Sequence, residues 1–320
     1  MKAKAKKYTQ HNRHVTKHKR KTKKRPNRLG KKRKDQSTQK ITQCSPKPHW
    51  ATNSFSCYTN MQLIRLRNEW NKQHPSQPLL KDDPLDIHRF FKKQFNTCGE
   101  NELCWLNQPA IYNKLLSADL RRSFRPKKPT SWQKNPVEWL SDVDITNVLT
   151  QYERAYKCFK FLGPSPIDFA EKMSPHSNQY VDDNLAKFQL SHYINKGILK
   201  IGIILNTDPH TKSGSHWISL FINLKRNYIF FFDSVGNKAP PQVNHFVKMI
   251  INQASQLSPP IHLIYDTNEG HEHQTGNTEC GIYSLYVVVN LLEDKFTTQY
   301  LKTHTINDKF VFQFRDKYFR

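Results

Sequence analysis

One cysteine of the chain lies where a polar loop meets a long apolar segment. Cys280 follows the loop and precedes residues 282–292, an apolar run without Gly or Pro that is long enough for a buried helix. A thiol in the first turn of such a helix lies beside unpaired backbone N–H groups and the positive end of the helix dipole, which stabilise the thiolate. Six residues earlier, Gln274 supplies a neutral N–H donor of the kind that stabilises an oxyanion together with a backbone N–H. The pattern therefore favours nucleophilic chemistry at Cys280.

A second pattern supplies an imidazole and a carboxylate. His216 opens the apolar segment 216–224, Asp233 follows the aromatic segment 228–232, and only three residues separate the two segments. This spacing predicts an antiparallel hairpin, in which residues equally far from the turn lie opposite each other. His216 and Asp233 are nearly equidistant from the turn. We therefore expect the carboxylate to orient the imidazole and to stabilise its protonated form, while the other ring nitrogen faces the thiol.

Other interpretations of these residues are available. Cys280 could be an inert packed thiol, because unreactive buried cysteines outnumber nucleophiles, and Asp233 could simply end a hairpin. His271 and His273 lie closer to Cys280 along the chain and could act as the base, although no acid at strand spacing orients them. The two histidines are also too few to hold a catalytic zinc, which needs three protein ligands. We expect neither a metal nor a cofactor.

The combined pattern resembles a known family, the adenain-like (C48-type) cysteine proteases. This family includes the SUMO-deconjugating proteases and the polyprotein-processing proteases of adenoviruses and of large cytoplasmic DNA viruses, with the type found in African swine fever virus as the closest. The similarity lies in His-Trp opening a strand, Asp-Ser closing the next, and Gln-x5-Cys-Gly before a helix. The segment 139–145, Trp-Leu-Ser-Asp-Val-Asp-Ile, is similar to the Trp-Leu-x-Asp-x-x-Ile segment near the start of the family's catalytic domain. The resemblance covers roughly residues 135–295.

The resemblance implies an α+β fold, in which a mixed sheet with flanking helices carries the nucleophile at a helix N-terminus. It also implies a smaller, mainly helical arm domain ahead of this core. The implied catalytic residues are His216, Asp233, Gln274 and Cys280. Trp139 and Trp217 are implied to bind substrate, with Trp139 flat over the substrate's C-terminal glycines. From the residues alone, Trp139 is equally well a core aromatic packed against the helix that follows it.

The function that the resemblance implies is that of a cysteine endopeptidase. It would cut virion polyprotein precursors after Gly-Gly-x motifs, in the virion and the host cytoplasm. One alternative is an isopeptidase that removes SUMO or another ubiquitin-like protein, and the alternative location is the nucleus. A second alternative function is that of a non-catalytic DNA-binding virion protein in which the protease site has decayed.

The charge of the chain is concentrated at its N-terminus. The net charge is +25, and residues 1–50 hold 19 Lys and Arg against one acid, Asp35, so this segment alone carries +18. A segment with so much like charge and little apolar content is expected to be disordered. We expect residues 1–40 to contact DNA or another polyanion without sequence preference. A nuclear-localisation signal or a solvated tail would have the same composition. No apolar run is long enough to predict a membrane span or a signal peptide.

We expect a disordered basic arm at 1–48, a mainly helical domain at 49–130 and the catalytic domain at 131–320. Periodicity predicts helices at 60–72, 85–95, 141–161 and 242–254, strands at 197–206 and 261–265, and a last strand in which Phe310, Phe312 and Phe314 alternate. The six cysteines show no dense disulfide pattern and fit a reducing compartment. Cys98 and Cys104 form a candidate metal or disulfide pair, with packed thiols as the default expectation.

Overall fold

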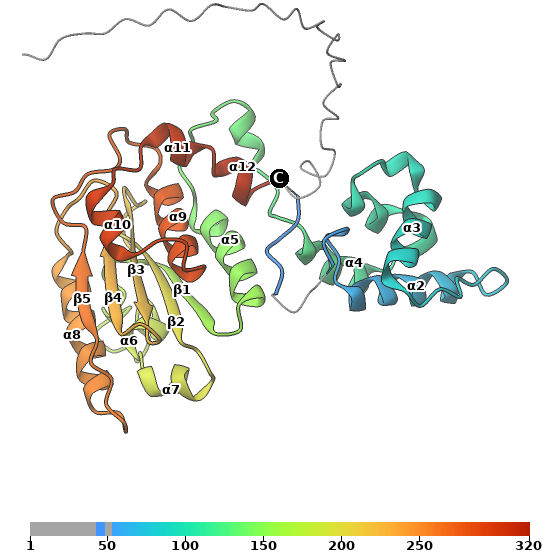
Figure 1. Cartoon of the computed structure of the whole chain (residues 1–320). Helices are drawn as coiled ribbons and strands as arrows, with labels where there is room; N and C mark the ends of the chain where they lie inside the picture. The colour runs from blue at the N-terminus through green and yellow to red at the C-terminus, as the bar shows by residue number, and fades with distance from the viewer. Residues whose placement is uncertain (1–42, 49–52) are drawn as a thin grey trace, which may run out of the picture. The chain divides into compact units, whose positions relative to one another are not determined.

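The computed structural model describes residues 43–48 and 53–320. Its C-terminal part is built on a five-stranded mixed sheet with the strand order β1-β2-β3-β4-β5 (Figure 1). The strands are β1 (Phe159–Pro166), β2 (Lys200–Asn206), β3 (Trp217–Asn223), β4 (Tyr228–Phe232) and β5 (Ile264–Thr267). The two inner pairs, β2 with β3 and β3 with β4, are antiparallel, whereas the outer pairs are parallel. This mixed sheet confirms the predicted α+β class.

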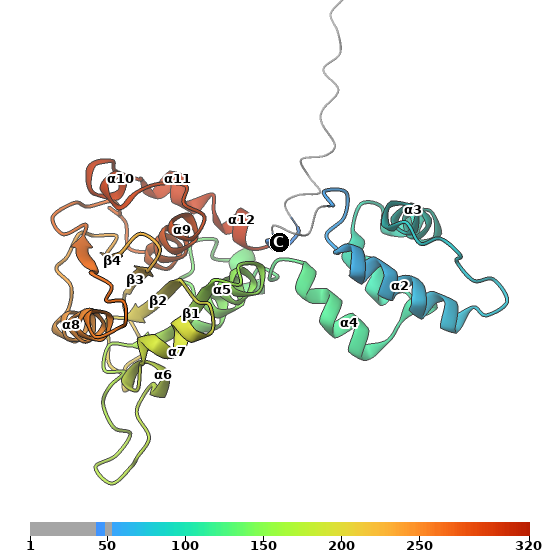
Figure 2. The ribbon, with the colours of Figure 1, turned by 60° about the horizontal axis from the view of Figure 1, so that its bottom comes forward.

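Helices cover both faces of the sheet. They are α5 (Asp142–Ala155), α6 (Asp183–Ala186), α7 (Leu190–Asn195), α8 (Pro241–Ser255), α9 (Cys280–Leu292), α10 (Thr298–Thr303), α11 (Asp308–Phe312) and α12 (Arg315–Tyr318). Helices α5 and α9 lie on one face, and α8 lies on the other (Figure 2). Because both faces are covered, the central strand β4 is apolar on both sides: Phe230 and Phe232 pack toward α9, whereas Ile229 and Phe231 pack toward α8.

The predicted hairpin is formed by β3 and β4. Asn223 pairs with Tyr228 next to the turn, and Ser219 pairs with Phe232 at the far end. His216 therefore lies just before β3 and Asp233 just after β4, at the same end of these two strands. The apolar run that follows Cys280 forms α9, and all of its residues are buried, as expected for a helix that is apolar all round.

Two predicted elements are wrong. The predicted helix at 141–161 ends at Ala155, and residues 159–166 instead form β1, which pairs in parallel with β2. In β1, Phe159 and Phe161 face the α9 side, so the apolar spacing there is that of a strand. The predicted terminal strand is instead the helical pair α11 and α12, because the Asn307 side chain accepts a hydrogen bond from the Phe310 N–H and starts α11.

The N-terminal part has a hydrophobic core of its own, which includes Tyr58, Phe91 and Trp105. Its α-helices are α2 (Asn60–Gln73), α3 (Pro84–Gln94) and α4 (Lys114–Leu120), of which the first two agree with prediction. Short 3-10 helices complete it: η1 (Asn96–Cys98), η2 (Glu102–Asn107), η3 (Pro109–Ile111) and η4 (Arg121–Ser123). A further 3-10 helix, η5 (Thr130–Gln133), leads into the sheet domain. The N-terminal core ends at Phe124, and the core of the sheet domain begins at Trp132.

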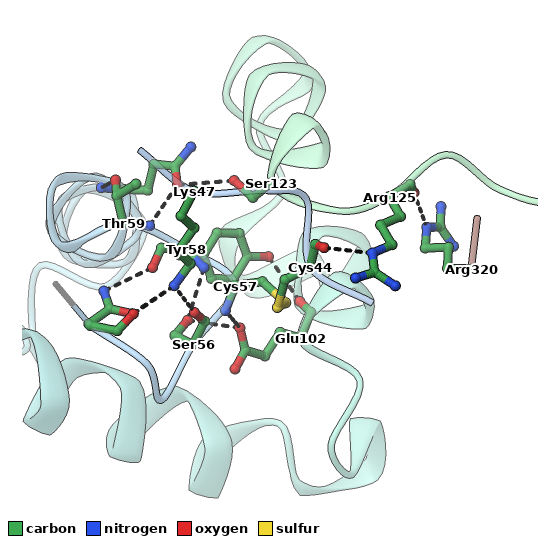
Figure 3. Close-up of a disulfide and its surroundings, with 12 residues drawn as sticks. Cys44, Lys47, Ser56, Cys57, Tyr58, Thr59, Glu102, Ser123, Arg125 and Arg320 are labelled. Carbon is green, nitrogen blue, oxygen red and sulfur yellow. Dashed lines mark hydrogen bonds between the residues drawn. A yellow bond between two sulfur atoms is a disulfide. The ribbon is translucent and has the colours of Figure 1, made fainter. Parts of the chain in front are cut away.

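Four cysteines form two disulfides, so the default expectation of packed thiols is wrong for Cys98 and Cys104. Cys98 joins Cys104, and Cys44 joins Cys57 (Figure 3). Beside the second bond, buried Glu102 accepts hydrogen bonds from the Ser56 hydroxyl and the Cys57 N–H, at 2.8 and 2.7 Å. The disulfide ties residues 43–48 to the start of the helical domain, so these residues do not belong to a disordered arm. The free cysteines of the described chain are Cys158 and Cys280.

The expectations for residues 1–42 lie outside the described part of the chain. Within residues 43–48 and 53–320, no helix is both long and apolar enough to cross a membrane. The same residues contain no cluster of three or more metal-binding side chains.

Packing between the sheet and α8 gives a stability prediction. Phe231 is fully buried, so Phe231→Ala should lower the free energy of unfolding by about 3–5 kcal/mol, through lost burial and the cavity left behind. Phe310 is 42% exposed, and Phe310→Ala serves as the matched control with a much smaller effect. Chemical denaturation followed by circular dichroism measures both, and equal losses would contradict the assigned packing.

Candidate active site

His216 and Asp233 meet at the open end of the β3–β4 hairpin, opposite its turn. The imidazole Nε2 lies 2.7 Å from Asp233 Oδ1, and Asp233 is buried. Because ionised carboxylates only accept hydrogen bonds, Nε2 carries a hydrogen and donates a hydrogen bond to Asp233. The other ring nitrogen, Nδ1, is then the one available to a thiol. The spacing inferred from the hairpin thus corresponds to a direct contact.

Asp233 is held in place by a residue that sequence reasoning missed. The Asn268 side chain accepts a hydrogen bond from the Asp233 N–H at 2.9 Å and donates one to the Asp233 carbonyl at 2.7 Å. The Val235 N–H donates to the same Oδ1 that contacts His216. These contacts fix both the backbone and the carboxylate of Asp233. A lone Asn one residue beyond a short edge strand gives no sequence signal of this role.

Cys280 is the first residue of α9 and is 2% exposed. Its side chain interacts with the His216 imidazole and contributes to the raised pKa of that residue. The preceding residue, Glu279, does not cap the helix with its side chain and instead forms a buried ion pair with Arg315 at 3.2 Å. The guanidinium of Arg315 also lies over the Trp132 ring. The segment before the thiol is therefore anchored to the C-terminal part of the chain.

The pKa of His216 reflects this environment. Burial by itself lowers the pKa, but the hydrogen bonds and negative charges of Asp233 and Cys280 outweigh it and raise the pKa from 6.5 to about 9. At neutral pH the imidazole is therefore favoured in its protonated form. A protonated imidazole beside a thiol is the arrangement that stabilises a thiolate.

Gln274 lies in the loop before α9 and is 2% exposed. Its amide Nε2 donates to the Gly276 carbonyl at 3.0 Å, and its Oε1 accepts from the Ser234 hydroxyl at 2.7 Å. The Gln274 N–H also donates to the Ser234 carbonyl. The residue after Asp233 therefore holds the side chain and the backbone of Gln274. The loop that carries Gln274 and the hairpin that carries Asp233 are directly joined.

A cleft of about 800 Å³ lies next to this group of residues. Trp139 and Trp217 both line it, together with Ser215, the neighbour of His216. Trp139 is 44% exposed, so its interpretation as a core aromatic is wrong. The Trp217 indole N–H donates to the Leu140 carbonyl at 2.9 Å, which joins the two walls of the cleft. That either tryptophan binds substrate stays a prediction.

The glycine after the nucleophile has a packing role. A Cβ built on Gly281 would lie 3.0 Å from Leu140 Cβ and 3.2 Å from Trp217 Cδ1. Since the Leu140 and Trp217 side chains lie so close, a larger residue would have to shift this wall of the cleft. Gly281 fits this position without such a shift.

The alternative base His273 is excluded by its contacts. Its Nδ1 accepts the Ile306 N–H at 3.1 Å, and its Nε2 donates to the Leu301 carbonyl at 2.9 Å. Burial, and to a lesser extent the charge of His271, lowers the pKa of His273 to about 4. Neither ring nitrogen is free for the thiol, so His273 is a neutral structural residue.

Together these side chains can support acyl transfer. A thiol, an imidazole that both accepts and returns a proton, a carboxylate that orients the imidazole and an amide donor are the parts that the reaction needs. The four residues lie on three loops and one helix end. His216 contacts Asp233 and interacts with Cys280, and Gln274 is bonded to Ser234, the residue after Asp233.

The contact between Asp233 and His216 predicts a pH effect. In Asp233→Asn the hydrogen bond to a charged acceptor is lost, so the pKa of His216 should fall well below about 9. A raised pKa stabilises the folded protein below pH 6.5, and this contribution is lost as the pH rises through about 9. NMR titration of His216 should show the lower midpoint in the variant. Identical midpoints in the wild type and the variant would disprove the coupling.

Comparison with known proteins identifies relatives. A model of the Ulp1 protease family, C-terminal catalytic domain, matches residues 142–320. A protein of Acanthamoeba polyphaga mimivirus named as a thiol protease is 25% identical over 300 residues, which cover 87% of this chain and 93% of the relative. A SUMO-1 cysteine protease of African swine fever virus (isolate Pig/Kenya/KEN-50/1950) is 26% identical over 251 residues, or 76% of this chain and 90% of the relative.

A solved structure shares the fold. The crystal structure of an African swine fever virus protease superposes with a TM-score of 0.59 and 21% identity, covering 88% of this chain and 96% of the viral protein. This likeness confirms the fold that the sequence resemblance implied. The family match extends over more than half of the 320 residues and includes the whole group His216, Asp233, Gln274 and Cys280. The chain belongs to the Ulp1 protease family and is a cysteine protease.

Proposed function

We propose that the protein is an endopeptidase that cleaves precursor proteins through a thioester on Cys280. The observation that carries this proposal is the position of His216, whose ring nitrogen lies 2.7 Å from Asp233 and whose raised pKa reflects both Asp233 and Cys280. A histidine held between a carboxylate and a thiol is the arrangement of a nucleophile with its oriented base.

The reaction has two stages. His216 holds the proton of the Cys280 thiol, as its raised pKa favours at neutral pH, and the sulfur attacks the peptide carbonyl. The Gln274 N–H and the Cys280 backbone N–H stabilise the resulting oxyanion. His216 then gives its proton to the leaving amine, so that a thioester remains on Cys280. In the second stage His216 takes a proton from water, the hydroxide attacks the thioester, and the carboxylic acid product and free thiol are released.

The cleft supports a substrate with small residues before the cut. Trp139 and Trp217 line it. Aromatic walls can pack against a substrate backbone that has no side chains, so we propose cleavage after Gly-Gly-x motifs. We further propose that the substrates are virion polyproteins and that the enzyme acts in the virion and the host cytoplasm.

A second candidate function is removal of a ubiquitin-like protein, in the cytoplasm or the nucleus. One relative is named as a SUMO-1 cysteine protease, which favours this alternative. A ubiquitin-like precursor and a polyprotein fragment, each with a Gly-Gly-x site, should therefore be assayed side by side. Faster cleavage of the polyprotein fragment supports the endopeptidase, and faster cleavage of the ubiquitin-like precursor favours the alternative.

Substitutions at the nucleophile and the amide donor test the mechanism. Cys280→Ala should abolish hydrolysis of Gly-Gly-x peptides, and Gln274→Ala should lower kcat by about 10²–10³, because a donor to the oxyanion is lost. Cys158→Ala, which removes the other free cysteine, is the matched control and should keep full activity. Hydrolysis that persists in Cys280→Ala would end the proposal, and a decayed site would leave Cys280 of the wild type unreactive toward iodoacetamide.

The basic N-terminal segment predicts contact with DNA or another polyanion. Deletion of residues 1–40 removes most of the local positive charge, so the affinity for DNA should fall and depend less steeply on salt. Fluorescence anisotropy at several salt concentrations measures both quantities. Peptide cleavage without DNA should change little. A truncated protein with the same salt slope would show that another part of the chain binds DNA.

A further inference from the structure

The amide group of Gln274 is fixed at both of its ends. A backbone carbonyl only accepts hydrogen bonds, so the group that faces the Gly276 carbonyl at 3.0 Å must be the Nε2 amide nitrogen. The Oε1 atom then faces Ser234, whose hydroxyl donates to it at 2.7 Å. Nε2 has a second hydrogen, which no acceptor in the described part of the chain takes. The two contacts therefore decide where this remaining N–H points.

The loop that contains the Gly276 carbonyl is held by a carboxylate from the C-terminal segment. Asp308 Oδ2 accepts the Gly276 N–H at 2.9 Å, the Thr275 N–H at 3.1 Å and the Thr275 hydroxyl at 2.9 Å. These donors belong to the two residues that follow Gln274. One carboxylate oxygen thus holds the loop that presents a carbonyl to Gln274.

The other oxygen of Asp308 reaches the helix of the nucleophile. The Tyr283 hydroxyl donates to Oδ1 at 2.9 Å, and Tyr283 lies one turn beyond Cys280 in α9. Asp308 therefore links the loop of Gln274 to the helix that carries the thiol. Burial raises the pKa of Asp308, but the hydrogen bonds from Gly276, Thr275 and Tyr283 outweigh it and hold the pKa below its usual value. The carboxylate stays ionised and is a strong acceptor throughout the neutral pH range.

We propose that Asp308 is a positioning residue for the oxyanion site, acting through the backbone of residues 275 and 276 to aim the free N–H of Gln274 at the developing charge. Asp308 itself touches neither substrate nor the reacting atoms. The inference rests on the proposed function, since it requires Gln274 to donate to an oxyanion. A purely structural Asp308 would lower stability without a specific loss of transition-state binding.

A double-mutant cycle separates these roles. Asp308→Ala should lower kcat for a Gly-Gly-x peptide by about 10-fold and leave KM nearly unchanged. The reason is that the hydrogen bond from Gln274 to the oxyanion, which this variant weakens, forms mainly in the transition state. In a Gln274→Ala background the same substitution should have little further effect, because the donor it positions is already gone. Asp308→Asn keeps an oxygen acceptor for the loop N–H groups and should lose less activity than Asp308→Ala.

Two further measurements exclude an unspecific loss of active-site structure in Asp308→Ala. Alkylation of Cys280 by iodoacetamide uses the thiol and His216 but forms no oxyanion, so its rate should be unchanged in Asp308→Ala. Asp316→Ala is the matched control, because Asp316 is an exposed acid in the neighbouring helix α12 that pairs with Lys128. It should leave kcat, KM and the alkylation rate as in the wild type. Should Asp308→Ala fail to fold, the cycle is carried out with Asp308→Asn.

The outcomes distinguish this inference from the proposed function. If Gln274→Ala lowers kcat but Asp308→Ala lowers it by the same factor with and without Gln274, the positioning role is wrong and the protease mechanism stands. A slower alkylation rate in Asp308→Ala would also overturn the inference, because the thiol itself would then be affected. If Gln274→Ala leaves kcat unchanged, the oxyanion role fails and the positioning role fails with it.

Discussion

The hydrogen bond between His216 and Asp233 is the constraint on which the site depends. It forms because β3 and β4 pair in a register that brings the start of one strand beside the end of the other. A buried carboxylate next to an imidazole keeps the ring oriented and raises its pKa, which in turn favours the charged form beside Cys280. A slip of one residue in this register would turn one of the two side chains to the other face of the sheet.

The helix of the nucleophile and the C-terminal segment form one packed unit. The Tyr283 hydroxyl of α9, which faces Asp308, also lies 3.1 Å from the His273 carbonyl and 2.7 Å from the Ile306 carbonyl, and Glu279 pairs with Arg315 in a buried site. Removing one member of such a pair leaves an uncompensated buried charge, which costs about 3–5 kcal/mol. The residues after α9 therefore support the position of the thiol, although they lie outside the sequence patterns that indicated the chemistry.

The sequence was sufficient where the signal is local. The hairpin and α9 could be predicted because strand alternation, a short turn and an uninterrupted apolar run are visible within a few residues. Asn268 and Asp308 could not be predicted, because each acts through a contact with residues more than 30 positions away. The same limit applies to β1, which becomes a strand only through pairing with β2. The pairing of Cys44 with Cys57 had no spacing signature that sets it apart from packed thiols.

The central claim is that Cys280 forms a covalent acyl intermediate with the help of His216. A peptide that ends in a Gly-Gly vinyl methyl ester reacts irreversibly with an activated thiol at the position of the scissile bond. Intact-protein mass spectrometry followed by peptide mapping measures the site and the number of adducts. The account predicts one adduct on Cys280, no adduct on the free Cys158, and loss of labelling in His216→Ala. An adduct on Cys158 alone, or undiminished labelling of Cys280 in His216→Ala, would contradict it.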